Sequence, residues 1–245
     1  MKNEKIKITW FGRCCFLVEI NKKKVLFDPY DTYCKVNIGI IEANILLSSS
    51  SWHDHGHIGA SPNAWIFTYP GSEENSGFQI TGIEAKENRG TPTVIFNLKY
   101  NSFSITNFAD FGPEQEESFN KSLSQADRKI LSETNIAFIR PDIVGDEIKV
   151  YGDNIHNENA LKYCNPSVIF PEHYFAESFI QEQVEENQKE NFLKPNIIVS
   201  EMIDIFKYPV KEINDCCVEI KESEITTGKV FYKFLKLHPQ VKYQL

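Results

Sequence analysis

The chain has 245 residues, and its 41% of hydrophobic and 13% of aromatic residues exclude a disordered protein and provide for a sizeable core. Its formal net charge of −8 argues against a nucleic-acid-binding surface, which needs clustered Lys and Arg, and favours action on a small-molecule substrate. No stretch approaches the roughly 20 apolar residues of a membrane span, so we expect no membrane partner. The segment after Met1 lacks the apolar core of a signal peptide, so we expect a cytoplasmic location.

The first half of the chain predicts short strands joined by turns. Residues 6–10 alternate between polar and apolar, and the polar run Asn21-Lys22-Lys23 indicates a hairpin turn. Asp28-Pro29 ends the strand before it, because proline cannot donate to a strand ladder. The strands predicted in this half are 6–10, 15–20, 24–28, 43–47, 63–69, 78–85, 93–98 and 102–107.

The second half alternates helices and strands. Leu123, Ala126, Ile130 and Leu131 share one face of a helix predicted over 122–134. Further helices are predicted at 157–164 and 175–190, and further strands at 136–139, 166–171, 217–220 and 230–235. This order favours two packed sheets with helices outside over a doubly wound βαβ repeat. We expect one domain over residues 1–205 and a C-terminal β extension over 206–245 packed on it.

The six cysteines do not have the spacing of a disulfide framework or of a metal site. Four of them form two adjacent pairs, Cys14-Cys15 and Cys216-Cys217, and Cys-x-x-Cys spacing is absent. We therefore expect reduced, structural thiols.

Metal-capable side chains follow the apolar run that ends at Leu47. Three of the six histidines and one aspartate stand within five residues, as His53-Asp54-His55-Gly56-His57. Imidazole and carboxylate groups bind Zn²⁺ and related ions, and a strand end holds them rigidly. Two later predicted strands lead to Asp110 and His173. Ligand types at three strand ends predict a metal site at one edge of the sheets.

With these residues the chain resembles the metallo-β-lactamase superfamily, specifically its branch of ascorbate-phosphate-lactonase-like metal-dependent hydrolases. Members open with a strand, Gly-His-Ala-Cys-Phe, a hairpin and Asp-Pro. This chain has Ile8-Thr-Trp-Phe-Gly-Arg-Cys-Cys-Phe16 and then Asp28-Pro29. The family motif His-x-His-x-Asp-His falls on residues 50–55. The resemblance covers residues 6–175 and implies an α+β fold, a four-layer αββα sandwich.

The resemblance also implies a degenerate ligand set. The residues of the family's second metal are all kept, as Asp54, His55, the bridging Asp110 and His173. The three histidines of the first metal are replaced by Ser50, Trp52 and Asn107. Trp52 cannot ligate, and its bulk is expected to fill the space of an ion. We therefore expect one divalent ion, Zn²⁺ or Mn²⁺, or none. Arg13 replaces a family histidine and is expected to place a positive charge near the site.

An alternative register and several plainer interpretations remain open. In the alternative, His53 and His55 supply the family's first two histidines, and its Asp-His pair falls on His57 and Ile58 and is lost. We rank it lower, because it removes more ligands than it restores. In the plainer interpretations His53 and His57 are surface or supporting residues, and His238 is incidental. Asp28 is interpreted as a turn residue, although the resemblance implies that family members keep this aspartate near the site. His156, before a predicted helix, is a further ligand candidate.

Two functions are compatible with this ligand set. The first is a mononuclear metal-dependent hydrolase of a small phosphorylated, lactone-like or phosphodiester substrate. In it Asp54 is both a ligand and a catalytic residue, and Arg13 stabilises an oxyanion. The second is a non-catalytic relative that acts as a binding or structural protein. The oligomeric state stays open, a homo-oligomer included.

Overall fold

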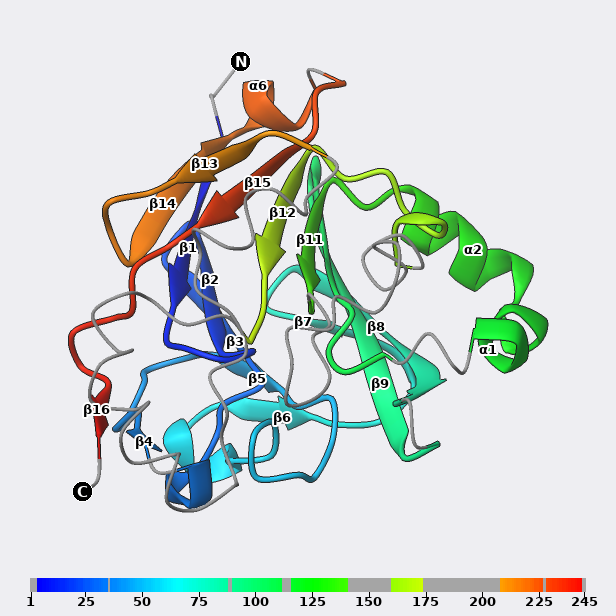
Figure 1. The fold of residues 1–245 in the computed structure, drawn as a ribbon. Coiled ribbons are helices and arrows are strands. Elements are labelled where there is room, and N and C mark those ends of the chain that lie inside the picture. The colour runs from blue at the N-terminus through cyan, green and yellow to red at the C-terminus, as the bar shows by residue number, and fades with distance from the viewer. Residues whose placement is uncertain are drawn as a thin grey trace, which may run out of the picture.

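Two β-sheets form the framework of the computed structural model of the chain, which describes residues 4–34, 36–87, 90–111, 116–140, 160–173, 208–226 and 228–243 (Figure 1). The smaller sheet has six strands, in the order β14 (Cys217–Lys221), β1 (Lys5–Trp10), β2 (Phe16–Ile20), β3 (Lys23–Phe27), β5 (Ile45–Leu47) and β6 (Trp65–Phe67). The larger has eight, in the order β13 (Val210–Glu212), β15 (Phe231–Phe234), β12 (Val168–Pro171), β11 (Ile136–Ile139), β10 (Phe103–Asn107), β9 (Pro92–Tyr100), β8 (Phe78–Lys86) and β7 (Gly71–Asn75). A separate pair joins β4 (Val36–Asn37) to β16 (Lys242–Tyr243).

The inner faces of the two sheets meet in an aromatic core. Phe138 of β11 stacks on Phe16 of β2, with ring centroids 4.3 Å apart, and meets Phe27 of β3 edge to face at 5.5 Å. All three rings are fully buried. Because side chains alternate between the faces of a strand, Leu26, between Val25 and Phe27, belongs instead to a second cluster on the other face of the smaller sheet. The predicted sandwich is therefore confirmed.

We expect Phe138→Ala to be among the more destabilising single changes in this core. It removes the ring that joins three strands of both sheets, and truncation of a buried Phe typically costs about 3–5 kcal/mol. Urea denaturation followed by circular dichroism measures the change. Ile40→Ala is the matched control, because Ile40 is 63% exposed and a surface change should stay within about 0.5 kcal/mol. Equal losses in the two variants would contradict this assignment of the core.

Helices and loops cover the outer faces. Helix α1 (Glu116–Ser122) and helix α2 (Gln125–Ser132) lie beside the larger sheet in Figure 1. Over the smaller sheet, the described residues contribute loops and two short 3-10 helices, η1 (Thr32–Cys34) and η2 (Ile58–Ala60). Helix α6 (Glu222–Ile225) follows β14. No helix in the described ranges is long and apolar enough to cross a membrane.

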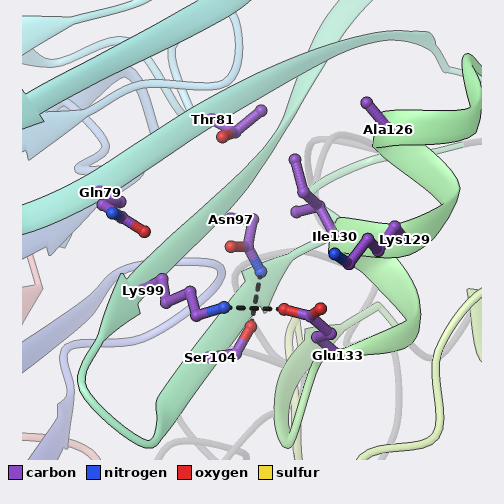
Figure 2. Close-up of a pocket in the computed structure, with 9 residues that line it drawn as sticks. All are labelled: Gln79, Thr81, Asn97, Lys99, Ser104, Ala126, Lys129, Ile130 and Glu133. Atoms are coloured by element: carbon purple, nitrogen blue, oxygen red, sulfur yellow. Dashed lines mark hydrogen bonds and ion pairs between the residues drawn. The ribbon is translucent and has the colours of Figure 1, made fainter.

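A cavity lies between α2 and the outer face of the larger sheet (Figure 2). Its volume is about 280 Å³, and it is lined by Gln79, Thr81, Asn97, Lys99, Ser104, Ala126, Lys129, Ile130 and Glu133. Asn97 Nδ2 donates to Ser104 Oγ at 3.0 Å, and Lys99 Nζ pairs with Glu133 Oε2 at 2.7 Å. These polar groups satisfy one another, and none of them is a predicted ligand.

Most predicted elements are present, and the departures have local causes. The predicted helix over 122–134 is shorter, because Ser124 caps α2: its Oγ accepts from the Asp127 backbone N–H, and the Asp127 carboxylate accepts from the Ser124 N–H. Strand β7 was not predicted, because it is an exposed edge strand without apolar alternation. The predicted helix at 175–190 lies outside the described residues.

The C-terminal strands extend both sheets. β14 pairs antiparallel with β1, whereas β15 lies between β12 and β13 and runs parallel to both. The segment predicted as a C-terminal β extension therefore contributes edge strands to each layer of the sandwich.

Parallel strands carry their carboxyl ends to a common edge. In the larger sheet β10, β11 and β12 are parallel, and in the smaller sheet β3, β5 and β6 are parallel. Segments that follow such strands leave at the same edge of each sheet, where α/β proteins commonly place their functional groups. The loop between β1 and β2 reaches this edge too, because the Arg13 carbonyl accepts a hydrogen bond from the His173 backbone N–H at 3.1 Å.

Candidate metal centre

Four side chains predicted as metal ligands converge at this edge. Asp54, His55, Asp110 and His173 each offer one ligand atom, and these atoms all lie within 4.8 Å of one another. Asp54 and His55 come from the loop after β5, Asp110 from the segment after β10, and His173 from the end of β12. Arg13 lies beside them, with Nη1 3.9 Å from Asp54 Oδ2. The structure thus brings all five predicted site residues together.

His55 is oriented by a buried carboxylate. Its Nδ1 lies 3.3 Å from Asp28 Oδ2 and 3.2 Å from Ser49 Oγ. Asp28, fully buried, also accepts hydrogen bonds from the Ser49 backbone N–H at 2.7 Å and from Asn107 Nδ2 at 2.8 Å. A carboxylate beside Nδ1 favours the tautomer with its proton there. Nε2 faces the aspartates, 3.3 Å from Asp110 Oδ2 and 3.8 Å from Asp54 Oδ2. Burial lowers the pKa of His55, but Cys14, Asp110 and Asp28 together raise it well above its ordinary value, so a metal ion would take the place of a proton on Nε2.

Asp110 lies between cationic and imidazole groups. Its Oδ1 is 2.7 Å from Arg140 Nη1 and 3.4 Å from His173 Nε2. Burial alone would raise the pKa of Asp110, but Arg140, His55 and His173 together hold that pKa well below its ordinary value. Burial lowers the pKa of His173. At neutral pH the pair therefore presents a carboxylate and a neutral imidazole, which are the protonation states that ligate metals.

The donor set fits a divalent ion. His55 Nε2 and His173 Nε2 are buried and have no hydrogen-bond partner among the described residues. Buried polar atoms are nearly always paired, so two such nitrogens beside two carboxylates indicate a missing partner. Two imidazole nitrogens and two carboxylate oxygens are ligands that Zn²⁺ and Mn²⁺ both accept.

The backbone around the centre is strained at four places. Arg13, Asp28, Ala109 and His173 have φ of 49°, 42°, 48° and 52°, in the left-handed region that non-glycine residues rarely occupy. Each of these residues is one of the four ligand candidates, precedes one in the chain, or contacts one. Such strain costs on the order of 1–3 kcal/mol per residue and tends to gather at functional sites.

Several residues of the site were not predicted from the sequence. Arg140, at the end of β11, pairs with Asp110. Glu172, next to His173, is fully buried, and burial, together with Asp28, raises its pKa well above the ordinary value. Burial and the nearby Asp110 raise the pKa of Glu87 to about 7. Asp28, interpreted above as a turn residue, positions His55. Its sequence signals were Asp-Pro at a strand end and the resemblance, in which family members keep this aspartate near the site.

The other histidines lie elsewhere. His53 is half-exposed, with Nδ1 2.7 Å from Asp31 Oδ2 and its ring stacked on Tyr33. This placement agrees with a surface role and contradicts the alternative register, in which His53 is a ligand. His238 packs against Phe11, with ring centroids 4.4 Å apart. His156 lies outside the described residues.

The residues at the family's first-metal positions have other roles or none. Trp52 is 52% exposed, so the prediction that its bulk fills the space of an ion was wrong. Trp52 lies in the bend at residues 51–52, before the turn at 53–55, and its indole faces solvent. Asn107 is buried and supports Asp28. Ser50 uses its Oγ to accept a hydrogen bond from the Trp52 backbone N–H at 3.3 Å.

Comparison with known proteins identifies the fold independently. A family model described as a beta-lactamase superfamily domain matches residues 7–173, which include all four candidate ligands. No curated protein matches the chain by sequence.

Solved structures match over nearly the whole chain. One is a Thermotoga maritima protein assigned to the zinc-dependent hydrolases of the metallo-β-lactamase superfamily. It has 21% identity and a TM-score of 0.60, and the match covers 94% of this chain and 100% of the Thermotoga chain. Igni18, a metallo hydrolase from Ignicoccus hospitalis, has 14% identity and a TM-score of 0.50. The match covers 88% of this chain and 98% of Igni18. A diphosphatase of the PhnP family has 10% identity and a TM-score of 0.50. The match covers 89% of this chain and 98% of the diphosphatase. At these identities the likeness establishes the fold.

Proposed function

Because the chain belongs to the metallo-β-lactamase superfamily, we propose that it is a metal-dependent hydrolase with one divalent ion held by Asp54, His55, Asp110 and His173. The observation that supports this most directly is the convergence of those four donors around two buried imidazole nitrogens without other partners. A divalent ion bound there would supply Lewis-acid polarisation of a substrate oxygen and would lower the pKa of a water molecule.

A single ion is favoured by the contacts of Asp110 and Asn107. In a two-metal member of this family the residue at position 110 bridges both ions. Here Arg140 is 2.7 Å from Asp110 Oδ1 and supplies a positive charge on that side. Asn107 is committed to Asp28, and the neutral oxygens of Ser50 and Asn107 would bind a second ion weakly. Arg140 thus takes over part of the electrostatic role of a second ion.

The charges around the centre favour an anionic substrate. The side chains of Arg13 and Arg140 are 17% and 29% exposed, so both guanidinium groups border the centre and reach toward solvent. Guanidinium groups bind phosphate oxygens through paired hydrogen bonds. We therefore place small phosphorylated compounds and phosphodiesters ahead of lactones, and the PhnP-family diphosphatase shows that the fold supports such chemistry.

Two residues of this chain have roles beyond holding the ion. The Asp54 side chain is 29% exposed, so its carboxylate faces the open side of the centre and can accept a proton from an attacking water molecule. Arg13 lies beside it, and its guanidinium can stabilise the negative charge that develops on the substrate oxygen.

Metal analysis combined with hydrolysis assays tests the proposal. We expect one Zn²⁺ or Mn²⁺ per chain by elemental analysis. We also expect hydrolysis of bis(p-nitrophenyl) phosphate or p-nitrophenyl phosphate that a chelator removes and the ion restores. Two ions per chain would contradict the single-ion centre. A folded protein that binds no ion would instead favour the non-catalytic relative.

A further inference from the structure

We propose that Cys14 is a ligand of this centre and binds the ion through its thiolate, so that the site contains sulfur and prefers soft ions. The inference rests on the proposed function, because it concerns the same ion. It departs from the interpretation of the six cysteines as structural thiols.

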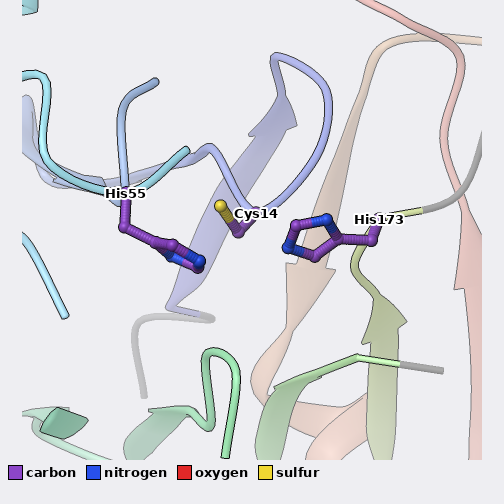
Figure 3. A group of neighbouring side chains, drawn as sticks. All are labelled: Cys14, His55 and His173. Carbon is purple, nitrogen blue, oxygen red and sulfur yellow. The ribbon is translucent and has the colours of Figure 1, made fainter. Parts of the chain in front are cut away.

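The geometry places the Cys14 sulfur in the ligand group. Cys14 lies in the loop between β1 and β2, and its Sγ and one ring nitrogen each of His55 and His173 lie within 4.8 Å of one another. Figure 3 shows the sulfur directed into the space between the two imidazole rings. All three side chains are buried. Zinc binds sulfur at about 2.3 Å and nitrogen at about 2.0–2.1 Å, so the donors of one tetrahedral ion stand about 3.5 Å apart. Cys14 is grouped with the two imidazoles and not with Asp54 and Asp110, so a tetrahedral ion that it joins would be held by the sulfur, His55, His173 and one carboxylate that moves toward them.

The other contacts of Cys14 leave its sulfur available. Its Sγ lies 2.8 Å from the Asp54 backbone carbonyl and 3.7 Å from that of Asp28, and the thiol donates to them. Both contacts use the single thiol proton, which the ion would displace, so on binding the sulfur would turn away from these carbonyls and toward the two imidazole rings. The second observation that indicates a ligand is independent of Cys14: His55 Nε2 and His173 Nε2 are buried without a partner.

The adjacent Cys15 shows that this placement is specific. Cys15 is equally buried, but it belongs to the second apolar cluster on the far face of the smaller sheet, with Leu26, Tyr30 and Leu46. Two neighbouring thiols of equal burial thus face different surroundings, one polar and rich in ligands and the other apolar. Cys15 is therefore a matched control.

A thiolate ligand changes what the centre selects. Thiolate favours Zn²⁺ and other soft ions over Mn²⁺, whereas carboxylates and imidazoles alone discriminate less. Binding converts the thiol to the thiolate, and the proton is released to solvent. The added negative charge is balanced in part by Arg140 and Arg13, which already pair with Asp110 and Asp54.

Titration of the full-length, reduced protein with Co²⁺ tests the ligand directly. A thiolate bound to Co²⁺ gives an intense near-ultraviolet charge-transfer band, which imidazole and carboxylate ligands do not give. We expect this band in the unmodified protein and in Cys15→Ser, and its loss in Cys14→Ser, while the visible d–d bands of bound Co²⁺ persist. In Cys14→Ser the affinity for Cd²⁺ should fall by at least about tenfold, since changes even in supporting residues cost about 10–100-fold. Mn²⁺ affinity should change less.

The outcomes separate this inference from the proposed function. Co²⁺ binding without a charge-transfer band, or a band that persists in Cys14→Ser, overturns the role of Cys14 and leaves the hydrolase proposal standing. Failure of the unmodified protein to bind Co²⁺, Zn²⁺ or Mn²⁺ overturns both. Circular dichroism checks that each variant is folded. If Cys14→Ser does not fold, Cys14→Ala replaces it, because alanine adds no polar group to the buried position.

Discussion

Replacing His173 by alanine is expected to abolish metal uptake while leaving the sandwich folded. The imidazole supplies one of the two buried ring nitrogens that make no hydrogen bond among the described residues, and the variant loses this ligand altogether. The loss should exceed the roughly 10–100-fold cost of removing a residue that only supports a ligand. The fold should survive, because the side chain projects from the end of β12 toward the centre. The backbone N–H that holds the Arg13 carbonyl remains in the variant.

The backbone of His173 calls for a second variant. Its φ of 52° lies in the left-handed region, which alanine adopts at some cost and asparagine tolerates better. His173→Asn should therefore keep the local backbone and still lose the imidazole. Elemental analysis after dialysis and calorimetric titration with Zn²⁺ measure uptake, and thermal melting measures the fold.

His53→Ala is the matched control for both variants. His53 is also a histidine of the predicted cluster, but it pairs with Asp31 at the surface. Its loss should leave Zn²⁺ uptake unchanged. Uptake that is unchanged in the His173 variants, or lost equally in His53→Ala, would show that the four-residue set is not the metal site.

The sandwich and the ligand set could be predicted because both leave strong local patterns. Alternating apolar residues predict the strands of the smaller sheet and the meander of β8, β9 and β10. A short apolar run bounded by turn residues is enough to predict a buried strand. Residues of the types that ligate metals follow β5, β10 and β12 in the sequence. Parallel strands that end at one edge then bring such residues together. The expected convergence therefore depended on strand order more than on exact boundaries.

The rest of the site could not be predicted, because its residues differ from their neighbours only in three dimensions. In the resemblance Cys15 takes the place of the family cysteine and Cys14 that of the alanine, which gives no sign of a ligand at Cys14. The side to which each thiol turns is set by the loop after β1. Arg140 looks like any charged residue after a strand, and its role follows from the place of β11 beside β10. Glu172 looks like a solvent-exposed acid. Trp52 was expected to be buried on the basis of its size, but the bend that carries it lies at the surface.

A second large effect is expected from Asp28→Asn, which should weaken metal binding without removing a ligand. The carboxylate of Asp28 accepts hydrogen bonds from Ser49 N–H and Asn107 Nδ2 and lies 3.3 Å from His55 Nδ1. The Ser49 N–H donates to Oδ1, whereas Asn107 Nδ2 and His55 Nδ1 both face Oδ2. An asparagine amide has only one acceptor oxygen, and the Ser49 backbone N–H can only donate, so the NH₂ group is expected on the side of Asn107 and His55. The simplest relief is for His55 to move its proton from Nδ1 to Nε2. A protonated Nε2 has no lone pair for an ion, so Zn²⁺ affinity should fall by about 10–100-fold.

The tautomer itself gives a readout that a purely structural role for Asp28 would not change. Burial lowers the pKa of His55, but Cys14, Asp110 and Asp28 together raise it well above its ordinary value, so the tautomer is read at alkaline pH, where the imidazole is neutral. Long-range ¹H–¹⁵N spectra of the metal-free protein should then show His55 protonated at Nδ1, and in Asp28→Asn at Nε2. Asparagine tolerates the left-handed φ of 42° at this position, so the backbone should be retained. Asp31→Asn is the matched control: the same substitution beside the surface His53 should alter neither Zn²⁺ affinity nor the tautomer of His55. If Asp28→Asn keeps the native tautomer and native affinity, Asp28 is a turn residue after all and His55 is oriented by Ser49. If affinity falls while the tautomer is unchanged, the buried negative charge of Asp28 is what the centre requires.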